Sequence, residues 1–211
     1  MSADWATISA LATAGGTLVL AMATFSSVRS ANRSARATER ALLAGIRPVL
    51  VPSRMDDPAQ KVGFADNHWV RIEGGHAVAE ATDENIYLAM ALRNVGNGLA
   101  VLDRWDLHPG RPVGGGVHGL PDDFRRLTRD IYVPAGDVGF WQGTYRDTAD
   151  PSFGTVAEAI RQREPLTVDL LYGDHEGGQH TITRFAFIPA GDDGWLASVS
   201  RHWNLDRADP R

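Results

Sequence analysis

Cysteine is absent from this sequence of 211 residues, and lysine occurs once, as Lys61, against 20 arginines. Without cysteine the chain has no disulfide bond, no cysteine-ligated zinc and no thiol nucleophile. This composition is compatible with a domain that works in a reducing cytoplasm. The formal net charge of −5 is small. Because nucleic-acid-binding domains usually carry a clustered basic face, we expect no nucleic acid among the partners.

Motifs for catalysis and cofactor binding are also missing. The sequence contains no nucleophile elbow, no phosphate-binding loop and no dinucleotide fingerprint. The glycine run 114–116 lies in a stretch, residues 111–120, that predicts a flexible loop. The seven histidines include no pair with metal-ligand spacing on one element. The sequence therefore predicts a non-enzymatic protein without a cofactor.

The longest uncharged stretch covers residues 6–28, between Asp4 and Arg29. Its length matches the roughly 20 apolar residues that a helix needs to cross a hydrocarbon core of about 30 Å. We therefore predict a transmembrane segment over residues 1–28. The alternatives are an alanine-rich helix packed on a soluble partner and a cleaved signal peptide. A signal peptide would begin with basic residues, which this chain lacks.

Basic side chains follow this stretch, and none precedes it. The arginines that follow it are Arg29, Arg33, Arg36, Arg40 and Arg47. Basic residues near a span stay on the cytoplasmic side of the membrane. The pattern predicts a single-pass protein of the cell membrane with its N-terminus outside and its C-terminal domain in the cytoplasm. Trp5 would then lie at the outer interface.

Residues 29–47 are rich in good helix formers and predict a juxtamembrane helix that continues the span. It should end at residues 45–47, because Pro48 disfavours helical geometry in the residue before it. Arg29, Arg33 and Arg36 recur at helical spacing. We expect them to face lipid headgroups, each contributing about 1 kcal/mol near an anionic surface. An ordinary solvated flank is the alternative.

Small residues within the span indicate self-association. Ala12 and Gly16 are four positions apart, a spacing that lets two membrane helices approach closely. A second seam of mostly small residues runs through residues 28–45, as in a short coiled coil. The expected partners are therefore the lipid bilayer, a second copy in a homo-oligomer, and a protein that the sequence does not identify.

Beyond Pro48 the hydrophobic pattern changes from helical to strand-like, with turns rich in Gly, Pro, Asn and Asp. The predicted strands cover residues 48–52, 68–72, 77–81, 86–95, 99–107, 131–133, 138–145, 166–172, 181–188 and 195–199. One helical turn is predicted over residues 122–128, and one short helix after Asp150. This mainly β pattern favours an immunoglobulin-like antiparallel β-sandwich over residues 48–205, followed by a polar tail, 206–211. A small β-barrel is the alternative.

Residues 92–100 read Leu-Arg-Asn-Val-Gly-Asn-Gly-Leu-Ala, after an Arg-Pro pair at the end of the long helix. Residues 172–174 form a later Tyr-Gly-Asp hairpin. In this combination the chain resembles uncharacterised single-pass membrane proteins of actinobacteria and other bacteria. The resemblance covers most of the chain and rests on structural turns. It implies a membrane location and a β-sandwich, and it brings no activity with it.

Acidic side chains and histidines occur together at one predicted hairpin, and further acidic side chains occur in predicted loops. Asp174, His175 and His180 surround one predicted hairpin and could hold a divalent metal, although no spacing rule supports such a site. An ordinary solvated turn is the alternative reading. Asp57, with its neighbour Asp56, and Asp66 lie in predicted loops, where we expect solvated carboxylates.

Three functional hypotheses follow. The first is a non-enzymatic, membrane-anchored protein that presents a cytoplasmic β-sandwich to a protein partner. The second is a metal-dependent enzyme built on Asp174, His175 and His180. The third is a membrane sensor that acts through oligomerisation of the span at Ala12 and Gly16. The tether and the missing catalytic motifs favour the first hypothesis, although a β-sandwich is linked to recognition only by analogy of fold.

Overall fold

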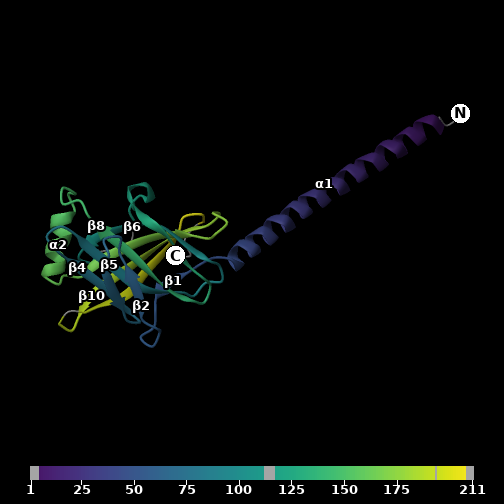
Figure 1. Cartoon of the computed structure of the whole chain (residues 1–211). Coiled ribbons are helices and arrows are strands. Elements are labelled where there is room, and N and C mark those ends of the chain that lie inside the picture. Colours follow the sequence, from purple (N-terminus) through teal and green to yellow (C-terminus); the bar gives the residue numbers. More distant parts are fainter. Residues whose placement is uncertain (1–4, 112–116, 193, 208–211) are drawn as a thin grey trace. The chain divides into compact units, whose positions relative to one another are not determined.

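The computed structural model describes residues 5–111, 117–192 and 194–207 (Figure 1). The chain divides into two compact units, residues 1–44 and residues 45–211. Three predictions fall outside the described parts. They concern the side chain of Trp5, the glycine run 114–116 and the end of the polar tail, 208–211.

The described residues form two α-helices, one short 3-10 helix and eleven strands. The first unit contains α1 (Trp5–Gly45) except its last residue, Gly45. The second contains β1 (Leu50–Pro52), β2 (Gln60–Gly63), β3 (Trp69–Ile72), β4 (His76–Ala81), β5 (Ile86–Asn94), β6 (Ala100–Pro109), η1 (Pro121–Asp123), β7 (Arg125–Val133), β8 (Val138–Tyr145), α2 (Phe153–Arg161), β9 (Leu166–Gly173), β10 (His180–Ala190) and β11 (Gly194–Asn204).

Helix α1 is continuous and ends at Gly45, as predicted from Pro48. Three threonine hydroxyls of its apolar part are satisfied within the helix. Thr13, Thr17 and Thr24 each donate a hydrogen bond to the carbonyl oxygen four residues earlier, at 2.8–2.9 Å. The helix therefore carries these polar groups without presenting unpaired hydroxyl hydrogens to its surroundings.

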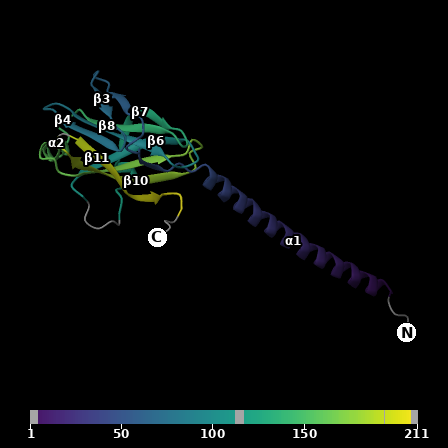
Figure 2. The same cartoon turned by 90° about the horizontal axis from the view of Figure 1, so that it is seen from below.

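Nine strands of the second unit form one antiparallel sheet in the order β1-β5-β4-β11-β10-β9-β6-β7, and β8 pairs with the other side of β5. The sheet curls around its core (Figures 1 and 2). Strands β2 and β3 form a separate hairpin. The predicted fold class, mainly β with a long N-terminal helix, is confirmed. A curled antiparallel sheet is consistent with a sandwich and with a half-barrel.

Strand β5 is apolar on both faces because both faces are covered. Leu88 and Met90 point into the main core, whereas Tyr87, Ala89 and Ala91 pack in a second cluster beneath the β2–β3 hairpin. The hairpin contributes Val62, Phe64, Val70 and Ile72 to this cluster. The continuous burial of β5, predicted from its sequence, thus results from a hairpin lying over the sheet.

Helix α2 covers the core where β4 and β11 diverge. The two strands are paired only at Ala77–Trp195 and His76–Leu196. The buried face of α2 joins the main core through Phe153, Val156, Ala157 and Ile160. The C-terminal end of α2 contacts the chain next to both strands. Arg161 lies 3.5 Å from Asp83, which follows β4, and Arg163 donates to the carbonyl of Gly194, at the start of β11, at 2.8 Å. In Figure 1, α2 lies at the end of the domain away from β1.

The predicted helical turn over residues 122–128 is wrong beyond Asp123. Only Pro121–Asp123 forms a 3-10 helix, and strand β7 begins at Arg125. Two arginines of β7 stack on aromatic rings of β8. Arg125 lies 4.4 Å from the ring centre of Tyr145, and Arg129 lies 5.2 Å from that of Phe140. Arginine in these positions hid the alternating pattern that identifies a strand.

Candidate functional site

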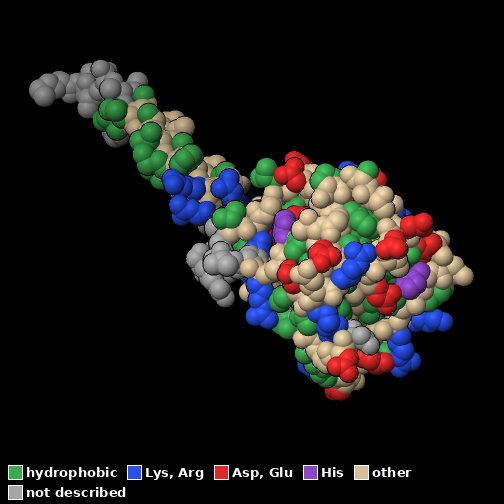
Figure 3. All heavy atoms as spheres, turned by 90° about the vertical axis from the view of Figure 1, so that its left-hand side faces the viewer, with side chains coloured by type: hydrophobic (Ala, Val, Ile, Leu, Met, Phe, Trp, Pro, Cys, Tyr) green, Lys and Arg blue, Asp and Glu red, His purple; other side chains and the backbone are tan. Residues whose placement is uncertain are grey.

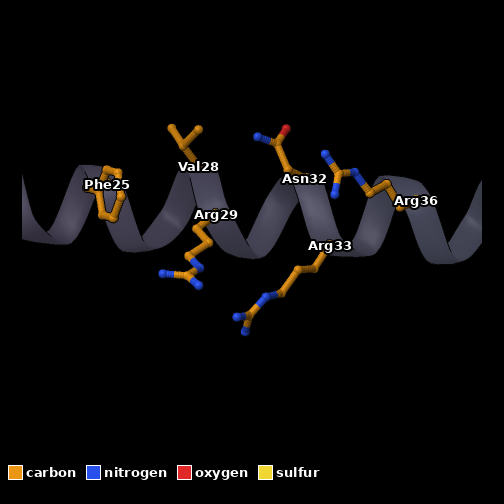
Figure 4. A pocket seen from close by; sticks show the side chains of 6 residues that line it. All are labelled: Phe25, Val28, Arg29, Asn32, Arg33 and Arg36. Atoms are coloured by element: carbon orange, nitrogen blue, oxygen red, sulfur yellow. The ribbon is translucent and has the colours of Figure 1, made fainter.

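The predicted lipid-facing residues lie exposed on α1. Figure 4 shows Arg29 and Arg33 projecting to the same side of the helix, with Arg36 turned toward Asn32. A shallow groove is lined by Phe25, Val28, Arg29, Asn32, Arg33 and Arg36. Guanidinium groups next to apolar side chains are the combination that suits a membrane interface. Contact of these arginines with headgroups stays a prediction.

Charge is divided unevenly along the chain. Residues 29–45 carry four arginines and one glutamate, a net charge of +3, whereas residues 46–211 carry 17 basic and 24 acidic side chains, a net charge of −7. Figure 3 shows the hydrophobic side chains of α1 followed by a cluster of basic ones. An anionic surface would therefore attract the helix and repel the β-domain.

The predicted association residues Ala12 and Gly16 are exposed on α1. A Cβ atom added at Gly16 would meet no atom within 4 Å beyond the backbone of its own helix and its two chain neighbours, among the residues that the structure describes. This face of the helix is therefore open to close approach by a second helix. Self-association through it stays a prediction.

The chain enters the β-domain through residues 46–49, which we call the junction segment. Its central side chain is that of Arg47, about 10% exposed. The guanidinium donates to Asn204 Oδ1 at 2.9 Å and to Thr181 Oγ1 at 3.4 Å, and it pairs with the carboxylate of Asp206. The first residue of the predicted polar tail is thus held against the start of the domain. Charge-assisted hydrogen bonds of this kind are stronger than neutral ones.

The backbone of the junction segment is held by Asn94, whose side chain is fully buried. Its Oδ1 accepts from the N–H groups of Val49 and Gly96 at 3.1 and 3.0 Å. Its Nδ2 donates to the carbonyls of Gly98 and Val133 at 2.7 and 3.0 Å. This single amide therefore joins the junction segment to the turn after β5 and to the end of β7.

Two glycines of the same turn make room for the junction segment. A Cβ atom at Gly98 would lie 1.7 Å from the carbonyl oxygen of Ile46, and one at Gly96 would lie 2.3 Å from that of Arg47. The turn Asn-Val-Gly-Asn-Gly, residues 94–98, thus packs directly against the junction segment. The sequence alone indicated only a turn. In the sequence, the Arg-Pro pair and these two glycines were the features that could have indicated this contact.

A buried hydrogen-bond chain continues inward from β1. The N–H of Leu50 donates to the Tyr172 hydroxyl at 3.1 Å, the Tyr172 and Thr183 hydroxyls lie 2.9 Å apart, and Thr183 Oγ1 lies 2.7 Å from His202 Nδ1. Burial raises the pKa of the Tyr172 phenol and lowers the pKa of His202. Sequence reasoning missed this chain, because its members come from four strands.

The proposed metal ligands do not form a metal centre in the described structure. Asp174 is buried, and its Oδ1 accepts from the N–H of Gly178 at 3.0 Å, as in an ordinary turn. His175 contacts Glu176 at 3.2 Å. Among the described residues, no three His, Asp or Glu side chains are grouped so that they could hold a metal ion. We therefore do not carry the metal-dependent enzyme forward.

Two carboxylates that were expected to be solvated have fixed partners. Asp57 pairs with Arg93, and the hydrogen bond from Arg93 lowers the pKa of Asp57. Asp66 accepts from the Tyr87 hydroxyl at 2.5 Å, which lowers the pKa of Asp66. The ring of His68 stacks on Tyr87 with ring centres 4.2 Å apart. Each carboxylate thus connects a loop to β5 through a side-chain contact. The positions of these residues in the sequence alone did not reveal the contacts.

A buried ion pair lies on the outer face of the sheet. Arg184 on β10 binds Asp169 on β9 through two hydrogen bonds, of 2.7 and 2.6 Å. Arg184 also lies 4.9 Å from the ring centre of Trp203 and donates to the carbonyl of Val117 at 3.2 Å. Its Nε and Nη2 groups are occupied by the protein itself, so we interpret this cluster as a structural element.

No protein-family model matches this sequence, and neither a curated protein nor a solved structure matches it. The resemblance to bacterial single-pass membrane proteins therefore stays a prediction.

Proposed function

We propose that this protein is a single-pass protein of the cell membrane that holds its β-domain in the cytoplasm, where the domain binds a protein partner without catalysing a reaction. The observation that carries the proposal is the exposure of the apolar part of α1. Leu11, Leu18, Leu20 and Phe25 are each more than half exposed. Water disfavours such a surface, and a bilayer removes it from water.

The dimensions and polar groups of α1 support a span. Over Ile8–Gly45 the helix is long and apolar enough to cross a membrane. The uncharged residues 8–28 rise about 31 Å at 1.5 Å per residue, close to the thickness of a hydrocarbon core. A hydroxyl in hydrocarbon needs a hydrogen-bond acceptor. The threonines of this stretch have one in the helix backbone.

The position of the arginines supports the orientation. Arg29, Arg33 and Arg36 follow the apolar stretch directly, and such residues are retained in the cytoplasm. In this orientation the three guanidinium groups reach the anionic headgroups of the inner leaflet.

The outer face of β3 and β4 supports partner binding best. Trp69 is 55% exposed, with Lys61 Nζ at 4.9 Å from its ring centre. Arg71 lies on the same face of β3, at a groove of about 200 Å³ that also includes Val78 and Trp195. An exposed Trp and an Arg on one face are typical of the residues that dominate binding energy at interfaces.

Protease protection tests the membrane part of this proposal. A C-terminally tagged chain is expressed in bacteria, and protease is added to intact and then to lysed spheroplasts. We expect the tag to sediment with membranes and to be cut only after lysis. A tag that is cut in intact spheroplasts contradicts the orientation, and a soluble protein contradicts the span.

Site-specific crosslinking tests the binding part. A photoreactive residue at position 69 should give one partner adduct in cells, whereas the same residue at Tyr132, exposed on β7, should not. The adduct should be lost when Arg71 is replaced by alanine. Equal crosslinking from positions 69 and 132 would indicate nonspecific contact and would contradict this surface.

A further inference from the structure

In the buried hydrogen-bond chain from Leu50 to His202, each donor and acceptor can be assigned. The backbone N–H of Leu50 can only donate, so Tyr172 Oη accepts from it. The hydrogen of the Tyr172 hydroxyl then has one partner among the hydrogen bonds of the described residues, Thr183 Oγ1. The Thr183 hydroxyl in turn donates to His202 Nδ1, which must be an unprotonated acceptor. In this state every hydrogen of the chain is used.

Protonation of His202 cannot keep this arrangement. The imidazolium carries a hydrogen on Nδ1 as well as on Nε2, so Nδ1 becomes a donor to Thr183. The Thr183 oxygen then accepts from His202 and either also accepts from Tyr172 or donates to Tyr172, because a hydroxyl has one hydrogen and two lone pairs. In either case one hydroxyl hydrogen, that of Thr183 or that of Tyr172, is left without an acceptor among the hydrogen bonds of the described residues. Because both residues are fully buried, no water replaces the lost partner.

Burial also disfavours the charged form of His202 and lowers its pKa. Arg47 of the junction segment donates to Asn204, two residues further along β11, and is paired with Asp206 of the tail. The facing residues of β10, Thr181 and Thr183, are uncharged, and β1 contains no titratable side chain. Arg201 lies over the ring of Trp203, and the Asp169–Arg184 pair holds the outer face of the sheet.

We propose that His202 is a pH-sensitive switch for the junction segment: its protonation leaves one buried hydroxyl hydrogen of the chain to β1 without an acceptor, and this loosens the hold of the β-domain on residues 46–50. The switch connects the state of the last strand to the point where the chain leaves α1. It operates whether or not α1 spans a membrane, so its test is independent of the proposed function.

Hydrogen exchange of the full chain in detergent, which does not require α1 to span a membrane, tests the switch. Exchange is measured at pH 7.5 and pH 5.5, and each rate is corrected for the intrinsic effect of pH. We expect the protection of residues 46–52 to fall about tenfold at the lower pH, as a buried polar group loses its partner. Protection of α2, at the other end of the domain, should not change. Unchanged protection of residues 46–52 would overturn the proposal.

Three variants identify the group responsible. His202→Gln keeps an acceptor oxygen for Thr183 and does not titrate, so the protection of residues 46–52 should no longer depend on pH. His175→Gln, on an exposed hairpin, should behave like the unmodified chain. Thr183→Val breaks the relay and should abolish the pH effect while His202 is still present. Retention of the full pH effect in His202→Gln or in Thr183→Val would show that another group is the switch.

Discussion

Among single residues, Asn94 has the clearest consequence for stability. Replacement by alanine removes the partners of four backbone groups, on Val49, Gly96, Gly98 and Val133. Rehydration recovers part of this loss, so we expect Asn94→Ala to lower the free energy of unfolding by about 2–4 kcal/mol. Urea unfolding of the full chain in detergent, followed by tryptophan fluorescence, measures the change.

The matched control for this residue is Asn97→Ala in the same turn. Asn97 holds the junction segment through its backbone N–H, which bonds to the Arg47 carbonyl at 3.3 Å and remains in the variant. We expect a change below about 0.5 kcal/mol. Equal effects of the two substitutions would mean that the Asn94 side chain does not hold the junction segment.

Also at the residue scale, His108 predicts a pH dependence. Its Nε2 lies 2.9 Å from Asp106, and this hydrogen bond raises the pKa of His108 above 6.5. The folded state therefore binds the proton more tightly, so the stabilisation is complete below about pH 6.5 and is lost as pH rises through the folded-state pKa. Because the His108 side chain is about half exposed, we expect less than about 0.5 kcal/mol.

Urea unfolding of His108→Gln at two pH values checks this sign. The variant should be less stable than the unmodified chain at pH 5.5 and nearly as stable at pH 8.5. Salt at 0.5 M should shrink the difference, because exposed charges are screened. A larger deficit at pH 8.5 than at pH 5.5 would contradict the pairing.

At the scale of elements, the turn after β5 must lack side chains where it meets the junction segment. Alanine at position 98 would place its Cβ against the carbonyl of Ile46, so one of the two segments must move. We expect Gly98→Ala to destabilise the domain by more than about 2 kcal/mol. Gly154→Ala in α2 meets no atom within 4 Å and should stabilise by up to about 1 kcal/mol through helix propensity. Thermal unfolding of both variants compares the two signs.

The span offers a second test among the elements. If Ala12 and Gly16 form an association face, Gly16→Leu should reduce crosslinked dimer in membranes without unfolding the helix, since the added side chain meets open space in one chain. Gly15→Leu adds the same bulk one position away, on a different side of the helix. Dimer yields that are equal in the two variants would argue against a specific face.

The elements also differ in how well the sequence predicts them. The long helix, its end at Gly45 and strand β5 follow from apolar length, a proline and a continuous hydrophobic run. Strand β2 was not predicted, because its four residues, Gln60–Gly63, are too few to show a period. The arginines of the predicted site could be named from their spacing. The network of Arg47 could not, because its partners lie more than 130 residues away.

For the whole molecule, the uneven distribution of charge along the chain predicts which side of the membrane holds the β-domain. Residues 29–45 carry a net charge of +3, and the residues before the apolar stretch include no basic side chain. If this difference holds the domain in the cytoplasm, replacing Arg29, Arg33 and Arg36 by glutamine removes most of it. We expect a measurable fraction of chains to expose the C-terminal tag outside, as protease-sensitive tag in intact spheroplasts.

The matched control replaces the same number of arginines beyond the reach of the orientation signal. Arg125, Arg126 and Arg129 lie on β7, more than 90 residues after the apolar stretch, whereas the signal acts within about 20 residues of a span. Glutamine at these positions should leave the tag fully protected, although the lost ring contacts of Arg125 and Arg129 lower domain stability. Full protection in both triple variants would mean that folding of the domain, and not the arginine cluster, keeps it inside.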